Sequence, residues 1–531
     1  GLGSDGTVSA NKSSIKIIGD ATHQYAQAYF AYDSRKAGGV TRSHLRFGKE
    51  PIHSTYYVEH ADFLSCSLDS YIFKFDMIKC LKKGGTFLLN TDIPADELEA
   101  RLPNRMKKQL AEKHAKFYII DANSLAAKIG LGRRTNTILQ SAFFYLNQNI
   151  MPYDQAQDWM KKFAQKSYAK KGDDIVKMNW DAIDAGAQGL IEIKVKDEWA
   201  SLDGSRVYAT TGDEYFDSFV NVIGSLDGYD IPVSKFLDYE LLDGTMRNNV
   251  TFMEKRSIAD RVPMWIKENC IECNKCAISC PHGVIRPFLL DKEDNKVKTI
   301  PSIMPKAVNF TIGINYEECT GCGLCTVSCP GKLGKKALEM IPNNKQDKDF
   351  DYLLKNNIND KYANIQTSKN LAFRNPKFEY SGACAGCGET PYLTNLTRVF
   401  NDNLVIANAT GCSSIYGGSA PSFPYSIPWA SSLFEDNAEY GYGILNGIKI
   451  KRDNIKKYME EYPRNKVFKK WLSNMNNYEI CKEVASEIDY KKHPYLKAME
   501  KYIIPKSMWI VGGDGFAYDI GYDGIDHVLS K

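Results

Sequence analysis

The 531-residue sequence has no apolar run that approaches the ~20 residues a membrane-spanning helix needs. It also has little net charge, because 68 basic and 64 acidic residues leave a formal charge of +4. A nearly neutral chain gives no reason to expect nucleic acid or an anionic membrane as a partner. Its hydrophobic content of 43% and charged content of 25% are those of an ordinary globular protein. The length predicts about three or four domains of roughly 150 residues each.

Eight of the fourteen cysteines form two copies of the pattern C-x2-C-x2-C-x3-C-P. The copies consist of Cys270, Cys273, Cys276 and Cys280, and of Cys319, Cys322, Cys325 and Cys329. In bacterial two-cluster ferredoxins with this spacing, the fourth cysteine of each copy reaches the other [4Fe–4S] cluster. The spacing therefore predicts one cluster on Cys270, Cys273, Cys276 and Cys329, and a second on Cys319, Cys322, Cys325 and Cys280. Structural zinc and disulfides are the alternatives, but zinc sites use paired C-x2-C units.

The abundance of cysteine in cluster spacing favours a reducing compartment, either the cytoplasm or a hydrogenosome-like organelle. Cys66 and Cys80 are isolated, and we expect them to be core thiols. We also expect apolar residues beside the clusters to keep water from the sulfurs, and these are Ile271, Ile278, Leu324 and Val327.

Residues 1–195 alternate strand and helix signals, which predicts a parallel sheet covered by helices. We expect strands at 15–19, 41–47, 56–58, 86–90 and 117–120. We expect helices from Asp20 to about 33, over 71–83 up to Gly84-Gly85, over most of 95–114, and in three later segments.

A glycine turn, Ser4-Asp5-Gly6-Thr7-Val8, lies near the start of the chain. Such turns expose backbone N–H groups to phosphate at the ends of strands, and Lys12, Lys36 or Arg46 could supply positive charge. An ordinary surface turn is the alternative.

The rest of the chain divides by composition. Residues 196–265 form a connector without clear periodicity, residues 266–335 hold the cysteine repeats, residues 336–380 form a second linker, and residues 381–531 form a last α/β domain. Within the second linker, residues 342–378 are polar, and we expect loops and short helices there.

The last domain contains Cys384, Cys387 and Cys412 among glycines. They could hold a third cluster whose fourth ligand lies elsewhere, bind zinc together with Cys481, or be buried thiols. Cys481 lies in the lysine- and glutamate-rich segment 464–490, which we expect to be a solvated helical surface.

An apolar strand at 509–511 leads into Gly512-Gly513-Asp514-Gly515. Glycines let a backbone approach a diphosphate, and the carboxylate of Asp514 could bind the Mg²⁺ that accompanies it. The same residues also make ordinary turns.

Taken together, these segments resemble the single-chain pyruvate:ferredoxin (flavodoxin) oxidoreductases, and the resemblance extends over the whole chain. Its motifs are Gly1–Val8, Ser14–Gly19, Tyr32–Ser34, Ser43–Gly48, Glu254-Lys255-Arg256, Cys384–Glu389, Thr410–Ser414, Ser432–Glu439 and Gly513–Gly521. The resemblance implies a Rossmann-like gamma-type domain (1–195), a linker domain named after Glu-Lys-Arg (196–265), a ferredoxin-like domain (266–335) and a truncated thiamine diphosphate-binding domain (381–531).

The resemblance also implies roles for individual residues. Ser4, Asp5, Gly6, Thr7, Val8, Lys36 and Asn136 would line a coenzyme A site. Cys384, Cys387 and Cys412 would hold the cluster nearest to thiamine diphosphate, and Glu389 would contact that cofactor. Gly513, Asp514, Gly515 and Phe516 would hold the diphosphate, with Asp514 on Mg²⁺.

The implied activity is oxidation of pyruvate with coenzyme A to acetyl-CoA and CO₂, with electrons passing to ferredoxin or flavodoxin in a homodimer. We expect the sequence to be a fragment that is inactive by itself, because the parts that would complete the thiamine site lie outside it. The resemblance implies two domains before Gly1 that supply the pyruvate-binding groups, and a C-terminal end after Lys531 that supplies the rest of the magnesium motif and the fourth cysteine of the third cluster. No substrate-binding carboxylate or arginine can be named in the sequence itself. The segment 422–428 is also shorter than the corresponding loop of the family, which leaves the local shape there open. A non-catalytic iron–sulfur electron carrier, a relic that binds no cofactor, and an oxidoreductase for a related 2-oxoacid are the alternatives.

Overall fold

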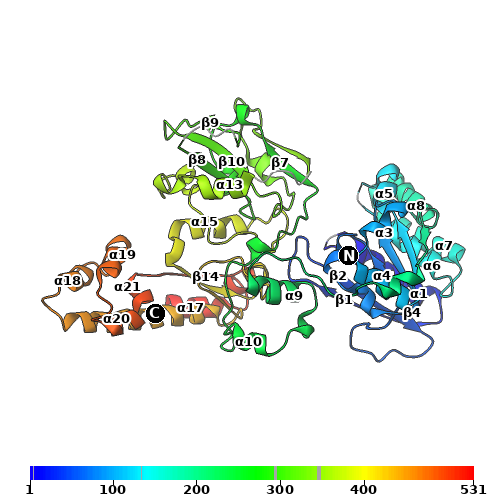
Figure 1. The fold of residues 1–531 in the computed structure, drawn as a ribbon, viewed down its shortest axis with the longest axis horizontal. Helices are drawn as coiled ribbons and strands as arrows, with labels where there is room; N and C mark the ends of the chain where they lie inside the picture. The colour runs from blue at the N-terminus through cyan, green and yellow to red at the C-terminus, as the bar shows by residue number, and fades with distance from the viewer. Residues whose placement is uncertain (4, 133, 292–295, 344–348) are drawn as a thin grey trace. The chain divides into compact units, whose positions relative to one another are not determined.

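The computed structural model describes residues 1–531 except 4, 133, 292–295 and 344–348. Its elements group into two compact units, which Figure 1 shows in different parts of the colour scale. The first unit contains residues 1–33 and 38–243, and the second contains residues 34–37 and 244–531. Residues 34–37 thus belong to the second unit, although the chain on both sides of them belongs to the first. The finer division into five domains stays a prediction.

The first unit is mixed α/β. Its strands are β1 (Tyr25–Tyr32), β2 (Thr41–Gly48), β3 (Ala61–Cys66), β4 (Leu81–Asn90), β5 (Lys116–Ile120) and β6 (Ile191–Ile193). Its helices are α1 (Thr7–Ala21), α2 (Tyr71–Lys74), α3 (Ala95–Arg101), α4 (Asn104–Glu112), α5 (Ala122–Ile129), α6 (Asn136–Leu146), α7 (Tyr153–Tyr168), α8 (Asp173–Gln188), α9 (Asn221–Gly224) and α10 (Ser234–Asp238).

A four-stranded sheet of order β3-β4-β5-β6 forms the centre of this unit. β3, β4 and β5 are parallel, whereas β6 is antiparallel to β5. Successive side chains of β4 lie on opposite faces of the sheet, as the period of a strand requires. Phe87 packs with Leu98 and Leu110 of α3 and α4, whereas Leu88 packs with Ala126 of α5. The predicted sheet covered by helices is confirmed in this coarse form.

Two expected elements near the N-terminus are wrong. The predicted strand 15–19 lies inside α1, and the helix predicted from Asp20 is replaced by β1. The buried residues of α1 are Ala10, Ser14, Ile17 and Ile18, a helical spacing that the short apolar run concealed. β1 pairs antiparallel with β2 along its whole length. Residues 56–58 form no strand either.

The helix expected over 71–83 is also mostly absent. It shortens to α2 and a 3₁₀ turn at Met77–Cys80, and β4 begins at Leu81. The register between β3 and β4 shifts, so that Ala61 faces Leu81 whereas Phe63 faces Thr86. Gly84, with φ +72°, lies in the residues that this irregularity inserts. The glycine pair therefore bends a strand instead of ending a helix. Strands at 41–47, 86–90 and 117–120 and the helices within 95–114 are confirmed, while four helices (α5 to α8) follow where three were expected.

The first part of the second unit carries the cysteine repeats. It contains β7 (Arg261–Trp265), α11 (Lys275–Ile278), β8 (Ile285–Leu290), β9 (Ile300–Pro301), β10 (Asn309–Ile314), α12 (Leu324–Ser328), β11 (Leu338–Pro342), α13 (Asp349–Asn356) and α14 (Ser368–Leu371). β7 pairs with β11, and β10 lies between β8 and β9, all antiparallel. α13 and α14 confirm the short helices expected between 342 and 378.

The second part is an α/β layer around a parallel sheet of order β13-β12-β14. Its strands are β12 (Leu404–Ala409), β13 (Trp429–Ser432) and β14 (Ser507–Val511). Its helices are α15 (Thr390–Phe400), α16 (Cys412–Gly417), α17 (Asn437–Glu460), α18 (Lys466–Leu472), α19 (Tyr478–Glu487), α20 (Pro494–Ala498), α21 (Glu500–Ile503), α22 (Asp514–Ala517) and α23 (Tyr522–Leu529).

Helices α18 to α21 gather near one end of α17 in Figure 1. They have a core of their own, in which Trp471, Cys481 and Leu496 are fully buried. The expectation of a plain solvated surface for residues 464–490 is therefore wrong for its inward face. The thiol of Cys481 lies 3.3 Å from the carbonyl oxygen of Met475, inside this apolar core. None of the helices in the described part of the chain is long and apolar enough to cross a membrane.

Candidate metal centres and cofactor site

A cavity in the second unit is lined by the four cysteines that the spacing predicts for the first cluster, Cys270, Cys273, Cys276 and Cys329. Its other walls include Trp265, Ile271, Ile312 and Leu338, which are apolar. Cys276 and Cys329 come from different repeats, so the expected exchange of the fourth ligand is present in the fold. The backbone N–H of Ala337 donates to the Cys329 sulfur at 3.3 Å, a contact of the kind that tunes clusters. These residues fit a [4Fe–4S] cluster.

The second predicted set also comes together. Burial, with the nearby Cys280 and Cys322 adding to it, raises the pKa of the Cys319 thiol to about 12. Burial and the same two cysteines also raise the pKa of Cys325. Thiols with such a high pKa would stay protonated at neutral pH, unless a metal stabilises the thiolates. These four residues therefore also fit an iron–sulfur cluster.

In the described ranges, no three His, Cys, Asp or Glu side chains converge closely enough to hold a single metal ion. The cluster assignment therefore depends on the four-thiol cavity and on the spacing of the repeats. Of the apolar residues expected to shield the sulfurs, Ile271 lines the cavity although it is 39% exposed. Val327 is wrong for this role, because the residue is 74% exposed.

The turn from Cys384 to Cys387 lies beside the second set of cysteines. The amide of Cys387 donates to the carbonyl of Cys384 at 3.1 Å, and Gly386 between them has φ +78°. A Cβ atom placed on Gly386 would lie 3.7 Å from Cβ of Cys322. Cys412 begins α16 directly after β12, and Tyr416 of that helix lies near Cys387 and Glu389, whose charges add to the effect of burial in raising the Tyr416 pKa. Whether the three cysteines hold a third cluster stays a prediction.

The carboxyl ends of the three parallel strands meet at one edge of their sheet. Thr410 after β12 donates its hydroxyl to the carbonyl of Ser432 at the end of β13, at 3.0 Å. β14 leads there into Gly512 and Gly513, followed by Asp514 at the start of α22. This edge is where ligands bind in open α/β sheets.

Gly512 and Gly513 of this loop differ in how much space surrounds them. A Cβ on Gly512 would lie 2.6 Å from the ring of Phe516, so that position must stay glycine, whereas Gly513 has open space around it. Phe516 itself is buried with Ala409 and Ala438. Only its backbone, and not its ring, remains available to a diphosphate. Glu389 precedes α15 as its N-cap residue.

The predicted coenzyme A residues of the first unit lie together at the start of α1. Asp5 accepts hydrogen bonds from the amides of Leu2 and Thr7 at 2.9 and 2.8 Å. Gly6, with φ +87°, lies close to Asn136, whose Cγ would be 3.2 Å from a Cβ on that glycine. Val8 follows in the first turn of α1. Ser4 lies outside the described residues.

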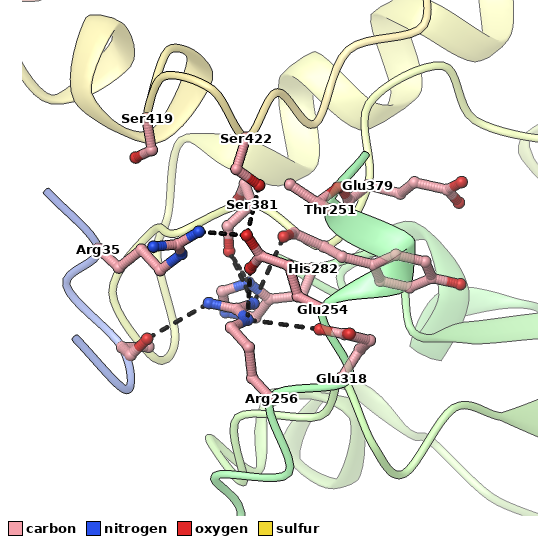
Figure 2. Close-up of polar contacts among 12 residues, drawn as sticks. Arg35, Thr251, Glu254, Arg256, His282, Glu318, Glu379, Ser381, Ser419 and Ser422 are labelled. Atoms are coloured by element: carbon pink, nitrogen blue, oxygen red, sulfur yellow. Dashed lines mark hydrogen bonds and ion pairs between the residues drawn. The ribbon is translucent and has the colours of Figure 1, made fainter. Parts of the chain in front are cut away.

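Lys36 lies in segment 34–37 of the second unit, where its amide donates to the carbonyl of Gly382 at 2.7 Å. Arg35 beside it forms an ion pair with Glu254, the first residue of the Glu-Lys-Arg motif. Figure 2 shows Arg35 reaching Glu254 from one side while Ser422 donates to the same carboxylate from another. Burial tends to raise the pKa of Glu254, but Arg35 and Arg256 outweigh it and hold the pKa below its usual value.

Arg256 connects three segments of the second unit (Figure 2). Its guanidinium lies 3.4 Å from the carboxylate of Glu318, the neighbour of Cys319. It also donates to the carbonyls of Ala37 at 3.3 Å and Ser381 at 3.2 Å. The segment that leads to Cys384 is thereby held against the loop that carries Cys319. Sequence reasoning identified Arg256 only as part of a family motif.

His282, directly after the Cys280-Pro281 pair, was missed by sequence reasoning. Its Nδ1 lies 3.3 Å from the carbonyl of Ser381, and the side chain is fully buried. Burial, reinforced by Arg256, lowers its pKa to about 3, so the ring is neutral near pH 7. One signal for His282 was present in the sequence, its position two residues after the predicted cluster ligand Cys280.

Comparison with known proteins agrees with this geometry. Residues 1–189 match the family model described as pyruvate ferredoxin/flavodoxin oxidoreductase, and residues 269–333 match the 4Fe-4S dicluster domain. A solved structure, the pyruvate oxidoreductase subunit PORC of Thermotoga maritima, is 19% identical over 36% of this chain and 95% of that one. Its TM-score of 0.30 is too low to support an argument.

Curated relatives match over the entire chain. The pyruvate:ferredoxin oxidoreductase of Moorella thermoacetica is 42% identical over 571 aligned residues, covering 100% of this chain and 48% of that protein. The pyruvate-flavodoxin oxidoreductase of Enterobacter agglomerans is 41% identical with the same coverage, and the pyruvate dehydrogenase [NADP(+)] of Cryptosporidium parvum is 38% identical, with 32% of that protein covered. The chain spans about half the length of the first two. Residues 1–189 thus match the pyruvate ferredoxin/flavodoxin oxidoreductase model, and the whole chain is similar to about half of proteins named for that activity.

Proposed function

We propose that this chain is the part of a pyruvate:ferredoxin or pyruvate:flavodoxin oxidoreductase that carries electrons away from the site of pyruvate oxidation. The overall reaction would convert pyruvate and coenzyme A into acetyl-CoA and CO₂. The observation that supports the proposal is the proximity of Gly386 to Cys322, whose Cβ would lie 3.7 Å from a Cβ on that glycine, because the Cys384–Cys387 turn then lies beside the second predicted set of cluster ligands. Short steps between adjacent centres are what electron transfer in such a protein needs.

The cofactor site would lie at the carboxyl edge of the β13-β12-β14 sheet. Thiamine diphosphate, when bound, supplies the electron sink for loss of CO₂. Gly513 and Gly515 would let the backbone approach its diphosphate, and Asp514 would offer an oxygen to Mg²⁺. Glu389 would contact the thiamine, and Cys384, Cys387 and Cys412 would hold the nearest cluster.

The hydroxyl of Ser413 in α16 is buried without a hydrogen-bond partner among the described residues. In the same helix, the buried Tyr416 lies beside Glu389, which adds to the effect of burial in raising the Tyr416 pKa. Orphaned polar atoms of this kind are the ones that a bound polar group satisfies. They support a ligand between α16 and the start of α15.

Coenzyme A would bind at the start of α1, where Gly6 lies close to Asn136 and is followed by Thr7 and Val8. The role of Lys36, which belongs to the second unit, stays a prediction from the family resemblance. A homodimer in the cytoplasm or in a hydrogenosome-like organelle is the setting we propose. Because the chain spans about half of its relatives, we expect the 531-residue polypeptide alone not to oxidise pyruvate.

Anaerobic reconstitution of the 531-residue chain tests these proposals in steps. We expect iron and sulfide to fill at least the two ferredoxin-like sites, and thiamine diphosphate to bind only when Mg²⁺ is present. Intact clusters without thiamine diphosphate binding would favour a plain electron carrier, and a colourless, iron-free product would favour a relic. Reduction of viologen that depends on both pyruvate and coenzyme A would contradict the expected inactivity of the chain alone.

A further inference from the structure

Arg398, in the last turn of α15, is a charged side chain that the proposed function does not use. It is fully buried. Its Nη1 donates to the amide oxygen of Asn395 at 2.9 Å and to the carbonyl of Ala277 at 3.4 Å, and its Nε donates to the carbonyl of Arg374 at 3.2 Å. Its Nη2 has no hydrogen-bond partner within the described residues. All the groups that it contacts are uncharged.

The charges around Arg398 do not balance it. No ion pair joins it to a carboxylate in the part of the chain that the structure describes. Burial, with the nearby Arg286 adding to its effect and Cys280 opposing both, lowers its pKa to about 9. Arg286 does not neutralise Arg398, since it is also a cation and forms an ion pair with Glu379. A cation that remains charged at neutral pH is thus buried without a protein anion, an arrangement that is costly unless something else neutralises it.

The position of Arg398 identifies the missing negative charge. Ala277, whose carbonyl it contacts, follows Cys276 directly and precedes Cys280 by three residues. On the same helix, the amide of Asn395 donates to the carbonyl of Ile278 at 3.0 Å. α15 therefore packs its Arg398 end against α11, the short helix between a predicted ligand of the first cluster, Cys276, and one of the second, Cys280. Of these two cysteines, Cys280 is the one whose charge acts on Arg398.

We propose that Arg398 is the buried counter-cation of the iron–sulfur cluster held by Cys280, Cys319, Cys322 and Cys325, and that it raises the reduction potential of that cluster. The inference depends on the cluster assignment in the proposed function. A four-thiolate cluster carries net negative charge, which grows by one when an electron arrives. A fixed cation in a poorly screened interior stabilises the reduced form more than the oxidised form.

Arg452 provides a matched control in the same unit. Its side chain is also buried, and its Nη1 donates to the carbonyls of Tyr502 and Ile503 at 2.7 and 2.9 Å. It lies in the helical core around Cys481, not among the cluster ligands. Removing it should disturb packing as much as removing Arg398, without changing the charge beside a cluster.

The experiment compares the full chain with its Arg398→Met, Arg398→Lys and Arg452→Met variants after anaerobic cluster assembly. Electron paramagnetic resonance during redox titration gives the midpoint potential of each cluster. We expect Arg398→Met to lower one midpoint potential and leave the other unchanged, with the same iron content. Arg398→Lys should remain closer to the unsubstituted chain, and Arg452→Met should change neither potential. Unchanged potentials in Arg398→Met would overturn the proposal.

A second measurement applies if Arg398→Met binds iron but the signals of its two clusters overlap in the redox titration. Unfolding by urea is followed for iron-free and cluster-loaded chains. A counter-cation predicts that Arg398→Met lowers the unfolding midpoint more in the loaded form than in the iron-free form, whereas Arg452→Met lowers both alike. Equal effects of Arg398→Met in the two forms would refute the role. Failure of the unsubstituted chain to bind iron would instead contradict the cluster assignment itself.

Discussion

The buried ion pair between Arg35 and Glu254 leads to a quantitative prediction. The two side chains are only 16% and 10% exposed, and the second cation, Arg256, is 6% exposed at 3.9 Å from Glu254. Glu254→Gln keeps the volume of the side chain but removes the charge that neutralises Arg35. Breaking a buried pair in this way costs about 3–5 kcal/mol. We expect a value near the lower end, about 3 kcal/mol, because Arg256 retains Glu318 and its carbonyl partners.

The assay is hydrogen exchange at the amide of Lys36, which donates to the carbonyl of Gly382. A loss of about 3 kcal/mol should accelerate exchange roughly a hundredfold, if segment 34–37 opens locally. Glu97→Gln is the control. It breaks the ion pair between Arg101 and Glu97, whose side chains are 58% and 53% exposed. The free energy of unfolding should therefore change by less than ~1 kcal/mol.

An apolar double variant separates charge from packing in the same assay. In Arg35→Met with Glu254→Leu, both charges of this ion pair are removed, so exchange at Lys36 should be slower than in Glu254→Gln. The reasoning is refuted if Glu254→Gln exchanges no faster at Lys36 than the Glu97→Gln control does.

Three further predictions concern other parts of the chain. Cys329→Ser should remove the cluster of the first repeat, and Cys280→Ser should remove that of the second. Each loss should be visible as the disappearance of one redox transition. If each variant instead loses the cluster of the repeat that contains the substitution, the proposed exchange of the fourth ligand is wrong. Cys481→Ser should leave the iron content unchanged while lowering the unfolding midpoint, because the thiol lies in an apolar core; a loss of iron would make it a ligand. Burial together with Arg42 and Arg46 lowers the pKa of His44 to about 4. Between pH ~6.5 and 4 the unfolded chain therefore binds a proton at His44 that the folded chain does not bind, so the free energy of unfolding should fall as the pH drops through this range. In His44→Gln this part of the acid sensitivity should disappear, and an unchanged pH profile of the urea midpoint would count against it.

Some errors of sequence reasoning have clear physical causes. The apolar run around Ile17 is too short to distinguish strand from helix, and only its packing against Phe144 and Ile183 decides for a helix. Cys481 stands among charged residues in the sequence, yet its side of α19 faces Trp471. Arg398 follows Thr390, Leu393, Thr394 and Thr397 on the buried face of α15, a periodicity that could have revealed its burial.

The sequence by itself determined that the chain has a 4Fe-4S dicluster domain and which cysteines are its predicted ligands, because each cysteine spacing is short and the chain can wrap a cluster locally. It also determined the strand that leads into the glycine loop at Asp514 and, through its motifs, the resemblance to the family. Tertiary structure alone decided which distant residues share a site: Arg35 with Glu254, Gly386 with Cys322, and Arg398 with the helix between Cys276 and Cys280. Such pairs depend on how whole elements pack, and no local pattern of residue types records the partner that a buried charge will meet.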